Sequence, residues 1–474
     1  MERLTFTQGV ATLAPAPAAP SQPWGEAEPE PARIGPAVRE RRPPRADAAY
    51  WGLFAFTALL LFRPQDSLPI LEPFHLPEVS ALTALIAMVV RRTNRGLTPI
   101  PWTPEVGGMA AISLVMLLTA PFSVWPSGAI STFTDLYLKV LLVFVLLVHT
   151  LSSPALLRRF TWLIVLAMGW ASANGVTDYV RGVNLMDGER LQGAMPGLGL
   201  MGNPNDLAMN MVAFLPFAAF KALAPGKPLP RLVSAVIVLL MLATILFTKS
   251  RGGFLGLAVV AVLVILQARR IRPGIAIAAL FAALVVPPFL PQTFWTRASS
   301  IFNAEEDTTG SREARIELMQ DAWRTFNERP FTGVGAGQFQ NYNPPERLQP
   351  WHETHNVELQ LLTELGLLGF AAFTWFLIRA AMTIGNTWRA LRPRGRRRAG
   401  VPPEADAFGP GEREWMRLHV AACIAAFAGW LVCAQFGSIG YYWTLYYIVG
   451  MAVAAHAITS ARLAPQPAAR RAGV

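Results

Sequence analysis

Apolar residues in this chain occur in long blocks separated by short segments rich in Arg, Pro and Gly. A block of about 17–25 apolar residues is long enough to cross the hydrocarbon core of a bilayer as a helix. We predict spans at 47–62, 77–90, 106–122, 135–151, 160–177, 205–223, 232–248, 253–268, 273–290, 356–384, 418–435 and 440–460. The pattern predicts an all-α, polytopic integral membrane protein of about 12 transmembrane helices, with both chain ends on one side.

The composition supports this class. Hydrophobic residues make up 53% of the 474 residues, charged residues only 15%, and the mean hydropathy is +0.36. A soluble protein of this length needs more charge on its surface. Cys423 and Cys433 lie ten residues apart in one apolar block, about 15 Å along a helix, which is too far for a disulfide. Two cysteines with this spacing also exclude a cysteine metal cluster.

The net charge of +11 orients the chain rather than indicating a nucleic-acid partner. With both termini inside, 29 of the 41 Lys and Arg residues fall in cytoplasmic segments, 11 fall in external loops, and Lys139 lies within a span. This asymmetry follows the positive-inside rule. We therefore expect a multi-pass protein of the bacterial inner membrane with cytoplasmic N- and C-termini and no nucleic-acid partner.

The polar segments divide the chain. Residues 1–46 are rich in Pro, Ala, Glu and Arg and are predicted to be a disordered cytoplasmic tail. The spans of 47–290 lead to a large periplasmic loop, 291–355, which contains a helical pattern at Ser311–Asn327. The segments that follow are the span 356–384, a basic cytoplasmic loop at 385–417, the spans of 418–460 and a cytoplasmic tail at 461–474. A polar loop as long as 291–355 is usually functional.

The end of this loop carries the first candidate chemistry. His355 lies where the chain re-enters the membrane, and a neutral histidine there could act as a general base for a hydroxyl. The alternative is a histidine that only hydrogen-bonds backbone. His352 and His355 are three residues apart, so the zincin spacing is absent. At 100° per residue, Glu358 lies on nearly the same helix face as His355 and could orient it. Glu364 points away and more simply pairs with another helix.

Arginines of the external turns form a second candidate group. Arg251, in Lys249-Ser250-Arg251-Gly252-Gly253, could bind a phosphate that the glycines allow to approach closely, or it could snorkel at a span boundary. Arg190 precedes Gly202-Asn203-Pro204, a helix start that could bind an anion or act only as a cap. Arg312 could also bind an anion, whereas solvated salt bridges explain the neighbouring Arg315 more simply.

Nucleotide-binding loops, nucleophile elbows and metal-binding motifs are absent from the sequence. We therefore expect an enzyme without a metal or cofactor, whose energy comes from an activated substrate in the membrane. A transporter for a lipid-linked or anionic solute is the competing class. It predicts ionisable residues spread through several spans, but here they gather at one face. A structural scaffold ranks last.

Together, the Ser-Arg-Gly-Gly turn, the Gly-Asn-Pro-Asn helix start, and His355-Asn356 followed by Glu364-Leu365-Gly366 resemble the O-antigen ligase/polymerase superfamily. Phe62-Arg63-Pro64-Gln65-Asp66 resembles its O-linked glycosylation branch associated with exosortase systems.

This resemblance implies a GT-C-like, metal-independent glycosyltransferase that transfers a glycan from undecaprenyl diphosphate to an acceptor hydroxyl on the periplasmic face. Because they match the family's motif positions, Arg190, Arg251 and Arg312 would bind the diphosphate and His355 would act on the acceptor. We add Asn203, from the Gly-Asn-Pro-Asn helix start, to the diphosphate site, and Glu358, from the helix-face argument, to the catalytic residues. The acceptor could be lipid A core, a protein or a growing glycan, so ligase, polymerase and protein O-oligosaccharyltransferase all stay open.

Overall fold

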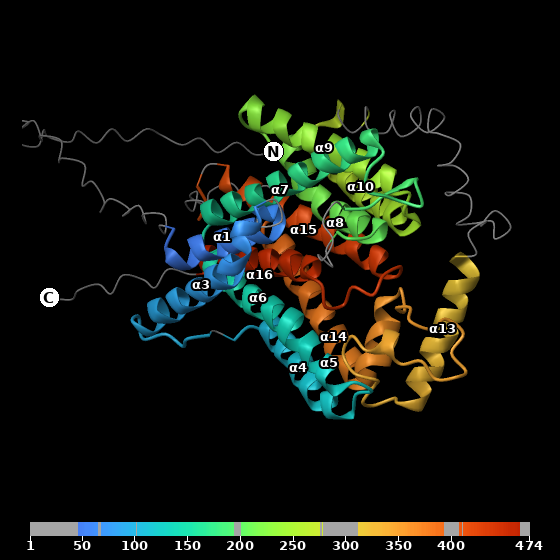
Figure 1. Cartoon of the computed structure of the whole chain (residues 1–474). Helices are drawn as coiled ribbons and strands as arrows, with labels where there is room; N and C mark the ends of the chain where they lie inside the picture. Colours follow the sequence, from blue (N-terminus) through green and yellow to red (C-terminus); the bar gives the residue numbers. More distant parts are fainter. Residues whose placement is uncertain are drawn as a thin grey trace, which may run out of the picture. The chain divides into compact units, whose positions relative to one another are not determined.

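The computed structural model describes residues 46–64, 68–100, 102–193, 201–274, 277, 311–392, 407–409 and 411–464 (Figure 1). Within these residues the chain is helical, apart from a small antiparallel hairpin of β1 (Leu185–Met186) and β2 (Arg190–Leu191). The predicted all-α membrane fold is confirmed.

Ten helical segments of the described chain are long and apolar enough to cross a membrane. They contain α3 (Leu76–Thr93), α4 (Pro104–Thr119), α5 (Pro126–Ser131) with α6 (Leu138–Thr150), α7 (Pro154–Arg181), α8 (Pro204–Leu223), α9 (Pro228–Thr248), α10 (Arg251–Ile271), α14 (Val357–Ala390), α15 (Glu412–Ala434) and α16 (Trp443–Leu463). The apolar α1 (Ala48–Phe62) is shorter. These helices coincide with eleven of the predicted spans, and the remaining one, 273–290, lies almost entirely outside the described residues.

Several helices begin at residues that the sequence marks clearly. Asn203, Ser250 and Asn356 are the N-caps of α8, α10 and α14, and each side chain accepts a hydrogen bond from a backbone N–H of the first turn. Such caps satisfy donors that the helix itself leaves unpaired. In α8, Pro204 follows the cap at a position where its missing N–H costs nothing.

Most side chains of α8, α15 and α16 are buried inside the bundle, whereas most side chains of α3, α9 and α10 are not. Glycines allow two of the central contacts. A Cβ atom on Gly256 of α10 would lie 2.5 Å from the Cys433 sulfur of α15, and one on Gly429 would lie 2.5 Å from a Val260 methyl group. Small residues of this kind let membrane helices pack closely.

Helix α14 contains a break at Gly366, whose φ of 64° and ψ of −166° are not helical. The Pro330–Gly337 segment, named here the glycine loop, packs against this break. Carbonyl oxygens of Thr363 and Glu364 accept hydrogen bonds from the loop's Val334 and Gly335 N–H groups at 2.8 and 2.9 Å. The break therefore fixes the large loop to α14. The predicted helix in that loop is confirmed as α13 (Ser311–Glu328), which contacts α14.

Candidate functional site

One polar corner lies where α8 and α10 begin, and it brings two of the predicted groups together. The Asn205 Oδ1 atom accepts hydrogen bonds from Ser250 Oγ at 2.9 Å and from Arg190 Nη2 at 3.1 Å. Arg190 Nε also donates to the Thr248 carbonyl at 3.2 Å. The hairpin arginine, the start of α8 and the turn before α10 thus form a single corner.

A small pocket opens into this corner. Its lining consists of residues from the starts of α8 and α10, from the end of α15 and from the chain after it: Asn205, Asp206, Met209, Ser250, Gly252, Gly253, Cys433, Phe436, Gly437 and Ile439. The N-termini of α8 and α10 both face this region, and helix N-termini favour anions. Arg251 is the first residue of α10 and adds a positive charge beside it. The helix starts and Arg251 favour phosphate oxygens at this corner, whereas the Asp206 side chain in the lining opposes them when it is ionised.

The glycines of the Ser-Arg-Gly-Gly turn have a packing role that the sequence did not reveal. A Cβ atom on Gly253 would lie 2.7 Å from the Ala208 Cβ atom of α8. One on Gly252 would lie 2.8 Å from the Phe436 Cβ atom. These glycines therefore bring α10 against α8 and against the chain after α15, and close approach to a phosphate is not needed to explain them.

His355 is held in a strained backbone conformation just before α14. Its φ is +49°, and its N–H donates to Ser438 Oγ at 3.0 Å. Non-glycine residues rarely adopt a positive φ, and strained residues of this kind are concentrated at functional sites. Burial, the Arg315 charge and His352 lower the pKa of His355 to about 4. The ring is therefore neutral near pH 7, as a general base requires.

Glu358 does not lie where the helical-wheel argument placed it. His355 precedes the Asn356 cap and is not helical, so 100° per residue does not relate the two side chains. Instead, Glu358 Oε1 accepts a hydrogen bond from Gln435 Nε2 at 2.7 Å, and Gln435 Oε1 faces Asn356 Nδ2 at 3.4 Å. Glu358 contacts the chain after α15 rather than the histidine ring.

That chain, Gln435–Tyr442, is named here the α15–α16 loop, and the sequence reasoning missed it. Its Ser438 holds the backbone of His355, while its Phe436 lines the pocket. The Arg315 guanidinium lies 5.8 Å from the centre of the Phe436 ring, and the Arg315 charge acts on His355. The loop thus joins the histidine to the pocket at the starts of α8 and α10. Its run of Gln, Gly, Ser and Tyr on the same predicted side as the large loop was the available signal.

Acidic groups lie near the same loop. Glu353 is accessible to solvent, but the surrounding protein removes enough water to raise the pKa of its carboxyl. Burial, Glu353, Asp206 and Glu364 raise the pKa of the Tyr442 hydroxyl. Despite these acids, the described part of the chain contains no cluster of three or more His, Cys, Asp or Glu residues suited to a metal ion.

Glu364 has a structural role, as the sequence suggested, although its partner is not another helix. Its side chain is buried, and its Oε2 atom accepts a hydrogen bond from the Gly337 N–H at 2.8 Å. The carboxylate therefore helps to hold the glycine loop at the break in α14.

Two further predicted residues complete the set. The Asn203 side chain acts as the α8 cap, because its Oδ1 accepts from the N–H groups of Asn205 and Asp206 and its Nδ2 donates to Asp206 Oδ2. The Arg312 side chain lies outside the described residues, although the helix α13 that carries it is described.

A comparison with protein families found one match, to a family described as O-antigen ligase, over residues 236–374. This region contains Arg251, the large loop, His355 and Glu358, but it ends before the α15–α16 loop. The match supports the superfamily that the motifs predicted. No curated protein matches the chain.

Proposed function

We propose that this chain, whose residues 236–374 match the O-antigen ligase family, transfers a glycan from undecaprenyl diphosphate to an acceptor hydroxyl at the periplasmic face of the inner membrane. The observation that carries the proposal is the position of Phe436. It lines the pocket at the α8 and α10 N-termini and lies under Arg315, whose charge acts on His355. A candidate base and a candidate diphosphate site are thus neighbours.

The diphosphate would bind at the corner formed by Arg190 and Arg251. In the donor, the bond between the anomeric carbon of the glycan and the diphosphate oxygen breaks. Negative charge therefore builds up on the undecaprenyl diphosphate leaving group. The two guanidinium groups and the start of α10 stabilise that charge. Arg312, on the first turn of α13, is proposed to reach the same phosphates. Asn203 acts through the helix that it caps.

His355 would accept the proton of the attacking hydroxyl as the acceptor oxygen bonds to the anomeric carbon. Its low pKa keeps the ring neutral but makes it a weak base. A bound diphosphate would neutralise the Arg315 charge and so raise the pKa of His355 when the base is needed. Glu358, through Gln435, would position the loop that holds the histidine. Because the leaving group is already good, positioning supplies most of the acceleration.

Reconstitution of the full chain in proteoliposomes tests the proposal. An undecaprenyl-diphosphate glycan is offered with lipid A core, a protein acceptor or a second donor molecule, and the products are separated by mass. Elongation of one acceptor with release of undecaprenyl diphosphate is expected, and the acceptor that grows distinguishes ligase, protein transferase and polymerase. Movement of the donor across the bilayer without transfer to any acceptor would instead indicate a transporter.

A further inference from the structure

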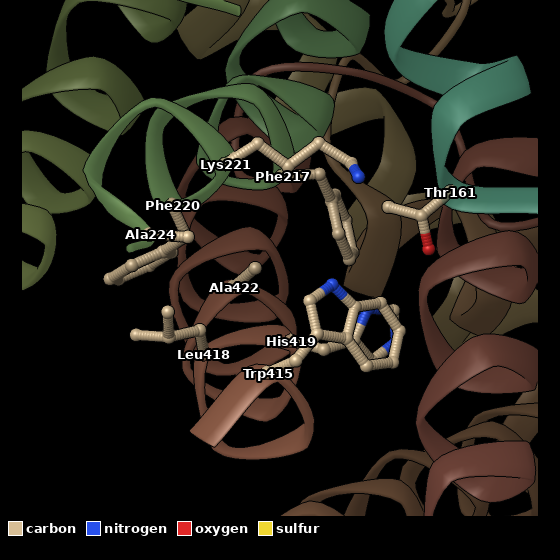
Figure 2. A pocket seen from close by; sticks show the side chains of 9 residues that line it. All are labelled: Thr161, Phe217, Phe220, Lys221, Ala224, Trp415, Leu418, His419 and Ala422. Atoms are coloured by element: carbon tan, nitrogen blue, oxygen red, sulfur yellow. The ribbon is translucent and has the colours of Figure 1, made fainter. Parts of the chain in front are cut away.

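A second polar pocket lies at the opposite ends of the two helices that carry the first one. Lys221 of α8 is 16 residues beyond Asn205, and His419 of α15 is 16 residues before Gln435. At 1.5 Å per residue each separation is about 24 Å along the helix axis. The second pocket is therefore almost a full membrane span away from His355. Its lining consists of Thr161, Phe217, Phe220, Lys221, Ala224, Trp415, Leu418, His419 and Ala422 (Figure 2).

His419 lines this pocket with an unsatisfied ring nitrogen. The residue is 4% exposed, its ring stacks on Trp415 with 5.2 Å between the centres, and its Nε2 atom has no hydrogen-bond partner in the described structure. A buried polar group without a partner costs about 1–3 kcal/mol. A headgroup hydroxyl that reaches Nε2 would remove this cost by donating a hydrogen bond to the neutral ring.

The charges around the pocket are positive. The Lys221 ammonium lies 4.1 Å from the centre of the Trp162 ring, and the charged group that acts on it most is another cation, Arg158. Arg158 in turn lies over Trp415. The ion pairs formed by the described residues do not include Lys221. Lys221 in the lining and Arg158 nearby together favour an anion at this pocket.

More positive charge lies at the end of α8. Arg231 and Arg272 donate to the last carbonyls of the helix, those of Ala222 and Leu223, at 3.3 and 3.1 Å. The acid whose charge acts on Arg158 is Glu412, which also lies 3.7 Å from Arg462 and accepts a hydrogen bond from the Gly409 N–H. This carboxylate is already shared among three groups and does not compensate Lys221.

We propose that this pocket binds the phosphate of an anionic lipid headgroup. Figure 2 shows the Lys221 ammonium extending towards Thr161. The rings of Trp415 and His419 overlap in this view and lie below the Lys221 side chain. Phe217, Phe220 and Leu418 provide apolar walls that suit the first acyl carbons. Trp and Lys side chains are common at this depth, where headgroups lie.

Binding of short-chain lipids to the full chain in detergent micelles tests this proposal. Dioctanoyl phosphatidylglycerol, dioctanoyl phosphatidylcholine and inorganic phosphate are titrated separately, and the apparent Kd is measured by native mass spectrometry. We expect phosphatidylglycerol to bind at least tenfold more tightly than phosphatidylcholine. Lys221→Gln should weaken phosphatidylglycerol binding about tenfold, and Lys221→Arg should retain it.

Lys227→Gln is the matched control, because it removes the same charge from an exposed position six residues away in the turn after α8. It should change the Kd less than twofold. Equal losses in the Lys221→Gln and Lys227→Gln variants would overturn the proposal, as would equal affinity for the two lipids. If Lys221→Gln does not fold, His419→Phe provides a second test, because it keeps the stacking on Trp415 and should still weaken binding. Inorganic phosphate that binds as tightly as the lipid would show that a free anion is the ligand, and would contradict the lipid.

Discussion

The docking of the glycine loop on α14 can be tested by adding a single methyl group. A Cβ atom on Gly333 would lie 2.4 Å from the Glu364 carbonyl carbon and oxygen, and Gly333 has a φ of +64°. Gly333→Ala therefore combines an unfavourable backbone conformation with a clash against the backbone of α14. Neither group can move aside as a flexible side chain could.

The expected cost has two parts. An alanine in the left-handed region costs about 1–2 kcal/mol. Relief of the clash separates the loop from α14 and breaks the hydrogen bonds to the Thr363 and Glu364 carbonyls and to the Glu364 carboxylate. Each buried group that loses its partner costs about 1–3 kcal/mol. With one or two such groups unpaired, we expect Gly333→Ala to destabilise the docked loop by about 2–8 kcal/mol.

Gly182→Ala is the control for the backbone part alone. Gly182 has a similar φ of +69°, and a Cβ atom there would meet no atom within 4 Å. Limited proteolysis between α13 and α14 reports the open loop directly. A difference of about 2 kcal/mol between the variants corresponds to about thirtyfold faster cleavage in Gly333→Ala. Similar cleavage rates in the two variants would refute the packing argument.

Further predictions concern the site and the bundle. With the pKa of His355 near 4, kcat/KM of the wild type should stay flat as the pH falls to about 5. Arg315→Gln removes a positive charge and so raises the pKa of His355, which should move the acid limb of the pH–rate profile to higher pH. An unchanged profile would show that the Arg315 charge does not act on His355. Ser438→Ala removes the acceptor of the His355 N–H and should lower kcat about tenfold with little change in KM for the donor. Gly253→Val should lower the thermal midpoint by overpacking α8 against α10, whereas Gly385→Ala, which meets no atom within 4 Å, should not.

Apolar block length was sufficient to predict the membrane helices, because backbone hydrogen bonding in lipid leaves few alternatives to a helix. The helix start at Asn203 was also predicted, since capping is local chemistry, whereas the caps Ser250 and Asn356 were not identified from the sequence. The ends of the helices were predicted less accurately than the helices themselves. The span predicted at 356–384 continues to Ala390, and its break at Gly366 could not be foreseen because the glycine loop that stabilises it lies about 30 residues earlier.

The candidate site was predictable in its parts but not in its connections. Arg190, Arg251 and His355 were identified from residue type and side of the membrane. Their link is the α15–α16 loop, where Ser438 contacts His355 across 83 residues of sequence. The periodicity of apolar residues in the sequence does not reveal a contact between such distant residues. Arg315 was assigned to solvated salt bridges for the same reason, because the sequence does not show that Phe436 and His355 also lie near it in space.

The central claim is that the Arg251 corner and His355 act on one substrate. Single-turnover glycan transfer from an undecaprenyl-diphosphate donor in proteoliposomes, measured for wild type, Arg251→Ala and His355→Ala proteins shown to be folded and inserted, tests it most directly. Loss of one charge-stabilising group typically lowers the rate by about 10²–10³-fold, and we expect a loss of this size in each variant. Transfer at a near-wild-type rate by either folded variant would contradict the account.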